Sequence, residues 1–126
     1  MLETLKNSRQ FGYVYQNGKS YANRYLVMYI ISNESEKNRI GISVSKKVGN
    51  SVVRHRVTRL IRESCRLNES MLKSGFDIVV VARAGAKDRN YFEIESAFMH
   101  LVGLHHIKKE VENVGKETVD KDNQII

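Results

Sequence analysis

The stretch Ser43-Val-Ser-Lys-Lys-Val-Gly-Asn-Ser-Val-Val-Arg-His-Arg-Val-Thr-Arg-Leu-Ile-Arg-Glu63 decides the fold, because it joins the end of a strand, a polar loop and a long helix. From Lys37 to Arg66 there are nine basic residues and one acid, a net charge of +8 in a chain whose formal net charge is +7. The rest of the chain is therefore nearly neutral. A cationic surface confined to one strand–loop–helix unit is typical of proteins that bind a polyanion.

The helix in this stretch, Val52 to about Asn68, is amphipathic. Residues at helical spacing form one face that is predicted to pack on the core: Val53, Val57, Leu60, Ile61, Ser64 and Leu67. The opposite stripe and its flanks are basic: His55, Arg59, Arg62 and Arg66, with Arg54 and Arg56 beside them. An ordinary solvated helix face alternates in charge sign, whereas this one brings like charges together. It favours phosphate binding, for which the planar guanidinium fork is suited.

The loop before this helix, Lys46–Ser51, adds two more cations, Lys46 and Lys47. Gly49 permits unusual backbone angles, and Asn50 or Ser51 is suited to cap the helix.

The remaining elements follow from periodicity and composition. The pattern predicts helices over Ser8–Gln16 (with Leu5 on its apolar face) and from Asn90 to about Lys108, and strands over Ser20–Asn23, Tyr25–Ile31, Arg39–Ser45 and Phe76–Arg83. The expected fold is an α/β (α+β) two-layer sandwich with roughly four strands in the order α-β-β-β-α-β-α. Residues 1–110 form one domain, and residues 111–126 are predicted to be a disordered tail. General rules make the β-α-β crossover right-handed.

Several classes of site are poorly supported. Cys65 is the only cysteine, which excludes an internal disulfide and a cysteine-based zinc motif. The histidines near the end of the chain lack the spacing of a metal site, and the carboxylates Asp77 and Asp88 do not form a recognisable catalytic pair. No metal site is predicted, and His100, His105 and His106 are expected at the surface or rim. The apolar runs are too short to cross a bilayer and no signal-peptide core is present, so we expect a soluble, cytoplasmic protein.

Aromatic residues form a second candidate constellation. Phe11 and Tyr15 share one face of the first helix, and Tyr29, with Tyr25 as a further candidate, lies on one face of the first long strand. Core packing is one interpretation of this set. The alternative is a shallow groove in which unpaired RNA bases lie on aromatic rings while nearby arginines follow the phosphates.

The run Ser45–Glu63 resembles the signature of the bacterial ribonuclease P protein subunit, a Lys-Lys-Val-Gly-Asn-Ala-Val loop followed by an Arg-Asn-Arg helix. Phe11 and Tyr15 before Asn17-Gly18, Ala22-Asn23-Arg24 and Val80-Val-Ala-Arg83 support the resemblance, which covers about Leu5 to Val102. His55 stands in place of the central asparagine and Thr58 in place of a lysine.

The resemblance implies a left-handed β-α-β crossover, against the general rule. It also implies an accessory subunit without catalytic residues, present as a single copy and paired with a catalytic RNA that removes the 5′ leader of precursor tRNA with bound Mg²⁺. By position, the contacts to the catalytic RNA and its phosphates are Lys46, Lys47, Asn50, Arg54, His55, Arg56, Arg59, Arg62 and Arg66. The residues of the leader cleft are Phe11, Tyr15, Tyr29 and Arg83. A ribosomal RNA-binding module and a DNA regulator with a basic helix remain as alternatives.

Overall fold

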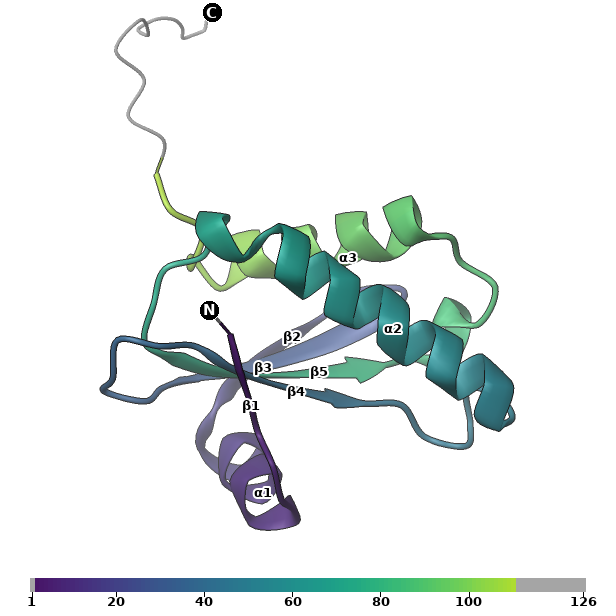
Figure 1. Ribbon diagram of the computed structural model, residues 1–126, viewed down its shortest axis with the longest axis horizontal. Helices are drawn as coiled ribbons and strands as arrows, with labels where there is room; N and C mark the ends of the chain where they lie inside the picture. The colour runs from purple at the N-terminus through teal and green to yellow at the C-terminus, as the bar shows by residue number, and fades with distance from the viewer. Residues whose placement is uncertain (1, 111–126) are drawn as a thin grey trace, which may run out of the picture.

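The computed structural model of the chain describes residues 2–110, and the predicted tail lies outside the described residues. One five-stranded sheet organises the fold, in the order β1-β4-β5-β3-β2 (Figure 1). The elements in chain order are β1 (Glu3–Thr4), α1 (Ser8–Asn17), β2 (Lys19–Ala22), β3 (Leu26–Ser32), β4 (Arg39–Ser43), α2 (Ser51–Leu67), η1 (Glu69–Met71), β5 (Phe76–Ala82), η2 (Ala84–Ala86) and α3 (Tyr91–Leu104).

The fold class is confirmed, with one strand more than expected. Strand β1 has only two residues, too few to show any alternation in the sequence, and it forms because it pairs in parallel with β4. Main-chain hydrogen bonds from Glu3 to the Asn38 carbonyl and from Leu5 to the Ile40 carbonyl close that edge of the sheet. Leu5 therefore precedes α1 and does not lie on its face, although it is buried beneath that helix.

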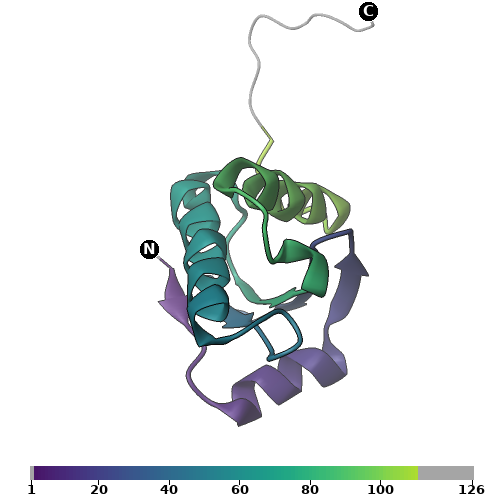
Figure 2. The same ribbon diagram turned by 90° about the vertical axis from the view of Figure 1, so that its right-hand side faces the viewer.

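The two faces of the sheet are covered unequally. α2 and α3 lie side by side over one face, and α1 covers part of the other (Figures 1 and 2). The larger core lies between the sheet and α2 and α3, where alternate residues of β3 and β5 such as Met28 and Val80 are fully buried. A smaller cluster of Leu5, Val14 and Val79 lies under α1. Strand β5 is thus buried on both faces, which explains its continuous apolar run.

The crossover from β4 through α2 to β5 is left-handed. In Figure 1 both strands run towards the right, α2 returns above them, and β4 lies nearer the viewer than β5. A right-handed connection would place α2 on the face that α1 occupies. The sheet face opposite α1 carries the side chains of Ile40, Ile78 and Val80, which are buried under α2 and α3. The alternation of side chains along the strands therefore determines the handedness of the crossover. The expectation of a right-handed crossover is wrong, and the left-handed crossover implied by the family resemblance is confirmed.

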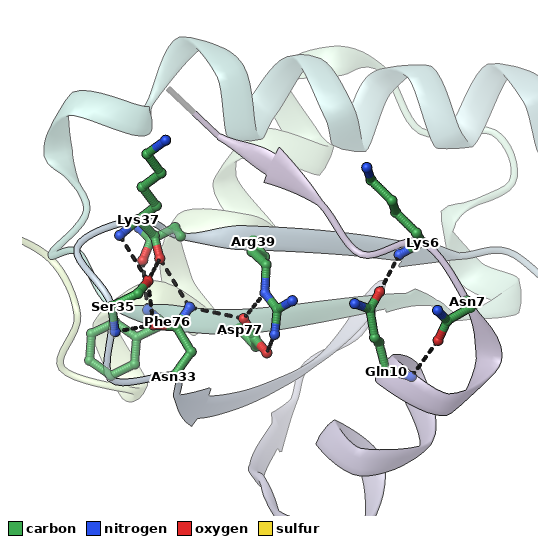
Figure 3. Close-up of polar contacts among 10 residues, drawn as sticks. Lys6, Asn7, Gln10, Asn33, Ser35, Lys37, Arg39, Phe76 and Asp77 are labelled. Atoms are coloured by element: carbon green, nitrogen blue, oxygen red, sulfur yellow. Dashed lines mark hydrogen bonds and ion pairs between the residues drawn. The ribbon is translucent and has the colours of Figure 1, made fainter.

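A buried ion pair ties β4 to β5 near the start of both strands (Figure 3). Asp77, only 4% exposed, accepts hydrogen bonds from Arg39 Nε at 2.8 Å and Arg39 Nη2 at 2.5 Å. Asn33 Nδ2 donates to the same carboxylate at 2.9 Å, and the Asp77 carboxylate raises the pKa of Arg39. Since the carboxylate is satisfied by three donors, its burial is tolerated. Asp77 therefore joins β4 to β5 through this ion pair.

The ends of two helices differ from the sequence prediction. Helix α3 begins with the predicted capping box of Asn90 and Glu93 but ends at Leu104, before Lys108. His106 has a positive φ of 59°, and Ile107 turns back into the core, where its carbonyl accepts a hydrogen bond from Lys73 N. Leu67 was predicted to face the core but is 53% exposed, because it is the last residue of α2.

Two side chains near β3 also differ from the prediction. Tyr25 precedes the strand and packs against the larger core, so it does not share a face with Tyr29. His105, expected at the surface or rim, is half-buried: its ring lies 4.7 Å from that of Tyr21, and Nε2 lies 2.9 Å from the Met28 carbonyl. Its burial lowers the pKa of His105.

Cys65 supplies a probe of this fold. It is 1% exposed, and burial raises the pKa of its thiol to about 12. We expect a thiol reagent to label the folded protein only through opening of the core, because the thiolate is the reactive form. Labelling followed by mass spectrometry at increasing denaturant measures this. Rapid labelling of the native protein at neutral pH would contradict the packing of α2 described here.

The raised pKa of the Cys65 thiol also means that the stability contributed by the neutral thiol is lost as pH rises above about 9.

Candidate nucleic-acid interface

The loop between β4 and α2 is held tightly against the helix that it precedes. Asn50 is the N-cap, and its side-chain oxygen accepts a hydrogen bond from Val53 N at 3.0 Å. Gly49 packs so closely on the first turn that a β-carbon there would lie 2.7 Å from Val53 Cγ1. Val48 is buried, whereas Lys46 and Lys47, which follow the end of β4, are exposed. The loop therefore presents two lysines from a rigid backbone.

The basic side chains of α2 fall into two groups by their contacts. His55, Arg59 and Arg62 are exposed and make no hydrogen bond or ion pair with the rest of residues 2–110. Arg66 is bonded to Glu63 through Nη2 at 2.6 Å, a contact that raises the pKa of Arg66 and lowers that of Glu63. The unpaired group is the part of the helix best able to accept an external anion.

Arg54 and Arg56 contact the protein itself. Arg54 is half-buried, and its Nε donates to the Gly49 carbonyl at 3.2 Å. Arg56 donates from Nη1 to the Lys87 carbonyl at 3.4 Å and from Nη2 to the Arg89 carbonyl at 2.9 Å. This guanidinium therefore ties α2 to the segment between η2 and α3. The sequence could not indicate this, since the two segments are 31 and 33 residues apart.

A groove of about 430 Å³ runs between the end of β4 and the first turns of α2. Ile42 and Val44 form its floor, and Arg54, His55 and Arg62 line its helix side. Thr58 also lines it, but its hydroxyl donates to the Arg54 carbonyl at 2.8 Å and so is occupied by the helix itself. The groove therefore combines an apolar floor with cationic walls.

The predicted aromatic set comes together on the opposite face of the sheet. The Tyr15 and Tyr29 rings meet edge to face with centroids 4.9 Å apart, and the Phe11 and Tyr15 centroids are 6.4 Å apart. The Phe11 ring lies on Gly41 of β4, where a β-carbon would come within 2.6 Å of it. Tyr15 remains 39% exposed. The set is thus partly core packing, as one interpretation held, and partly an accessible aromatic surface beside α1.

Arg83, the fourth predicted cleft residue, lies at the end of β5 and is exposed. By strand alternation it shares the sheet face of Val79 and Val81, the face on which α1 lies. Its Nη1 donates to the Asn23 carbonyl at 2.8 Å, which fixes the side chain at the rim of the sheet beside the β2–β3 turn.

The aromatic set and the basic helix lie on opposite faces of one sheet, and both contact β4 (Figures 1 and 2). Phe11 covers Gly41 from one side, while Ile42 and Val44 pack under α2 on the other. Strand β4 is therefore the element that connects the two candidate surfaces.

A family model described as Ribonuclease P matches residues 2–105. The chain is 70% identical over 107 residues to the "Ribonuclease P protein component" of Lachnoclostridium phytofermentans, a match that covers 85% of this chain and 92% of the relative. It is 52% identical over 99 residues to the protein of the same name from Clostridium botulinum, strain Okra, covering 78% and 89%.

The chain belongs to the ribonuclease P protein family. The solved structures agree: the Staphylococcus aureus RNase P protein superposes with a TM-score of 0.78 at 36% identity, covering 84% of this chain and 97% of that one. The Thermotoga maritima RNase P protein superposes with a TM-score of 0.74 at 30% identity, covering 79% and 94%. Membership makes the chain a component of an RNA-processing enzyme that acts in tRNA maturation. The two alternatives from the sequence, a ribosomal RNA-binding module and a DNA regulator, are therefore not favoured.

No three His, Cys, Asp or Glu side chains within residues 2–110 gather closely enough to hold a metal ion. Among the helices described for this range, none has the length and apolar character needed to cross a membrane.

Two glycines offer a test of the aromatic surface in this ribonuclease P protein. Gly41→Ala should lower the free energy of unfolding by about 1–3 kcal/mol, because the Phe11 ring must move off the sheet. Gly12→Ala should raise it by about 0.5–1 kcal/mol, because α1 has open space at that position. Chemical denaturation of both variants measures the difference. Equal stability of Gly41→Ala and the wild type would show that Phe11 does not rest on β4.

The two groups of arginines can be separated experimentally. Arg59→Ala should leave stability within about 0.5 kcal/mol of wild type, because Arg59 has no partner within the described chain. Arg56→Ala should cost about 1 kcal/mol, because the Lys87 and Arg89 carbonyls lose their donor. Denaturant unfolding of the two matched variants measures this. A stability loss for Arg59→Ala as large as for Arg56→Ala would contradict the division.

Proposed function

We propose that the chain binds the catalytic RNA of ribonuclease P through the 46–50 loop and α2, and holds the single-stranded 5′ leader of precursor tRNA on the face of the sheet beside α1. The observation that carries this proposal is the presence of unpaired cations and accessible aromatic rings on two separate faces. Phosphates provide the missing countercharge for Arg59 and Arg62 and hydrogen-bond acceptors for His55, and unpaired bases suit the aromatic rings.

The proposed contacts to the catalytic RNA comprise the two exposed loop lysines and the unpaired stripe of α2. Arg54, Arg56 and Arg66 keep donors free beyond their internal bonds, because a guanidinium carries five N–H groups. Asn50 contributes by setting the start of the helix, since its side-chain oxygen is already bonded to Val53 N.

Leader binding is assigned to Phe11, Tyr15, Tyr29 and Arg83. Tyr15 is the most accessible ring, and Arg83 supplies a cation at the rim through the N–H groups that Asn23 does not use. Stacking needs only the face of a base, so this surface would accept leaders of differing sequence.

Hydrolysis is assigned to the RNA, and the protein contributes affinity for substrate. The magnesium chemistry is likewise assigned to the RNA in this proposal, as the resemblance to the ribonuclease P family implies. We place one copy of the chain in each ribonucleoprotein. We locate the reaction in the cytoplasm, where RNA is present to bind the positively charged protein.

The two proposed surfaces should respond differently to mutation. With a matched catalytic RNA, Tyr29→Ala and Tyr15→Ala should weaken binding of leader-bearing precursor by about 1–3 kcal/mol and leave its salt dependence unchanged. Arg59→Ala should instead flatten the salt dependence of catalytic-RNA binding by about one phosphate contact. Equilibrium binding over a salt series, with leaderless tRNA as the control substrate, measures both. Equal changes of slope for Tyr15→Ala and Arg59→Ala would contradict separate base and phosphate surfaces, and cleavage by the protein alone would contradict the division of labour.

A further inference from the structure

A second groove opens at the end of the sheet, between the β2–β3 turn and the first turns of α3. It has a volume of about 460 Å³ and is lined mainly by Asn23, Arg24, Tyr25, Phe92, Ala97 and His100. None of the predicted RNA contacts lines it. Figure 2 looks onto this end of the molecule, where η2 and the start of α2 lie on either side of the strand ends.

Phe92 is an aromatic side chain without a packing role in this fold. It is 74% exposed, although it sits in the first turn of a helix whose other large apolar residues, such as Phe98 and Leu101, are fully buried. Within residues 2–110 its one ring contact is with Tyr91, in an edge-to-face arrangement with a centroid distance of 5.5 Å. A face of the ring is therefore available to a planar partner.

Two guanidinium groups lie over the neighbouring Tyr25 ring. The guanidinium carbons of Arg24 and Arg89 are 6.0 and 5.4 Å from its centroid, and Arg24 lines the groove together with Tyr25 and Phe92. Glu93 is the one acid in the lining, and it is already engaged by Arg89 at 3.4 Å and by Asn90 N in the capping box. The rim thus keeps an excess of positive charge beside an exposed aromatic ring, a combination suited to a nucleotide.

The groove and the proposed leader surface meet at the β2–β3 turn. Arg83, at the rim of that surface, donates to the carbonyl of Asn23, and Asn23 is itself part of the groove lining. Asn23 Nδ2 donates to the Ala97 carbonyl at 2.9 Å, so the turn is fixed to α3. The Arg56 bonds to the carbonyls of Lys87 and Arg89 hold the other side in place. A strand that leaves the α1 face at Arg83 would next reach the β2–β3 turn, where Asn23 and Arg24 line the groove together with Phe92.

We propose that this groove is a second single-stranded RNA site, which takes an unpaired base of the leader upstream of the nucleotides held beside α1. The base stacks on Phe92, and Arg24 and Arg83 bind the phosphates that connect the two sites. Asn90, Ser96 and His100 offer polar groups to the edge of the base. This inference rests on the proposed leader binding and extends it to longer leaders.

Leader length tests the proposal. The holoenzyme is reconstituted with its catalytic RNA, and affinity is measured for precursor tRNAs whose leaders increase one nucleotide at a time. Wild type should gain affinity in two steps, one for each site. Phe92→Ala should lose the second step, about fivefold or more in Kd, and keep the first, because stacking of one base accounts for at least that factor. Phe92→Tyr should keep both steps.

Matched controls separate this site from general effects. Leu104→Ala removes an exposed apolar side chain at the other end of the same helix and should leave both steps unchanged. Arg24→Ala should weaken long-leader binding and flatten its salt dependence, whereas Lys73→Ala, an exposed cation elsewhere, should not.

Several results would overturn the inference without touching the proposed function. The first is a wild-type protein whose affinity rises in a single step as the leader lengthens. The second is a Phe92→Ala variant that keeps both steps in affinity. The third is a Phe92→Ala variant that weakens the binding of short and long leaders equally. A photoreactive phenylalanine analogue at position 92 should crosslink to upstream leader nucleotides; crosslinks to the catalytic RNA alone, or none, would count against it. Failure of the proposed function would appear instead as wild-type protein that does not discriminate leader-bearing from leaderless tRNA.

Discussion

The burial of β5 on both faces is the constraint on which the rest of the structure depends. This strand pairs in parallel with β4 and antiparallel with β3, so its backbone is satisfied on both sides. Its side chains then need cover above and below the sheet, because Ile78 and Val80 point one way and Val79 points the other. α2 and α3 cover the first face, and α1 with Leu5 covers the second. Each surface proposed to meet RNA lies on or beside an element that covers β5.

This arrangement gives one small domain two chemically distinct surfaces for the proposed RNA contacts. The sheet separates the arginine stripe of α2 from the aromatic rings beside α1, so that a catalytic RNA and an unpaired leader, bound as proposed, need not compete for the same side chains. The stripe accepts the mutual repulsion of neighbouring cations, a cost of a few tenths of a kcal/mol for each close pair. In the proposed complex, bound phosphates remove that cost. Affinity for RNA then depends on the folded helix, which brings the cations together, and not on the basic sequence alone.

Much of the fold could be predicted, because it depends on periodicity that any reader of the chain can see. The alternation of Leu26–Ser32, the inward face of α3 and the capping box at Asn90 all appear as expected. Strand β1 was missed because two residues carry no period, and the end of α3 was placed too late because the polar residues after Leu104 resemble a helix end. Leu67 and Tyr25 were misplaced since helical or strand spacing says nothing about where neighbouring elements stop.

The sequence by itself determined the family, the cationic helix and the identity of the aromatic set, because these depend on residue types at short, fixed spacings. Only the tertiary structure decided the meeting of Tyr15 with Tyr29 and the use of Arg56 as a hydrogen-bond donor to the backbone at Lys87 and Arg89. It also decided the hand of the crossover, on which the general rule and the family resemblance disagreed, and it brought Arg24 of the β2–β3 turn and Phe92 of α3 into one groove. The physical reason is that contacts between distant segments depend on which sheet face each element covers, and that choice is made by the burial of the whole core.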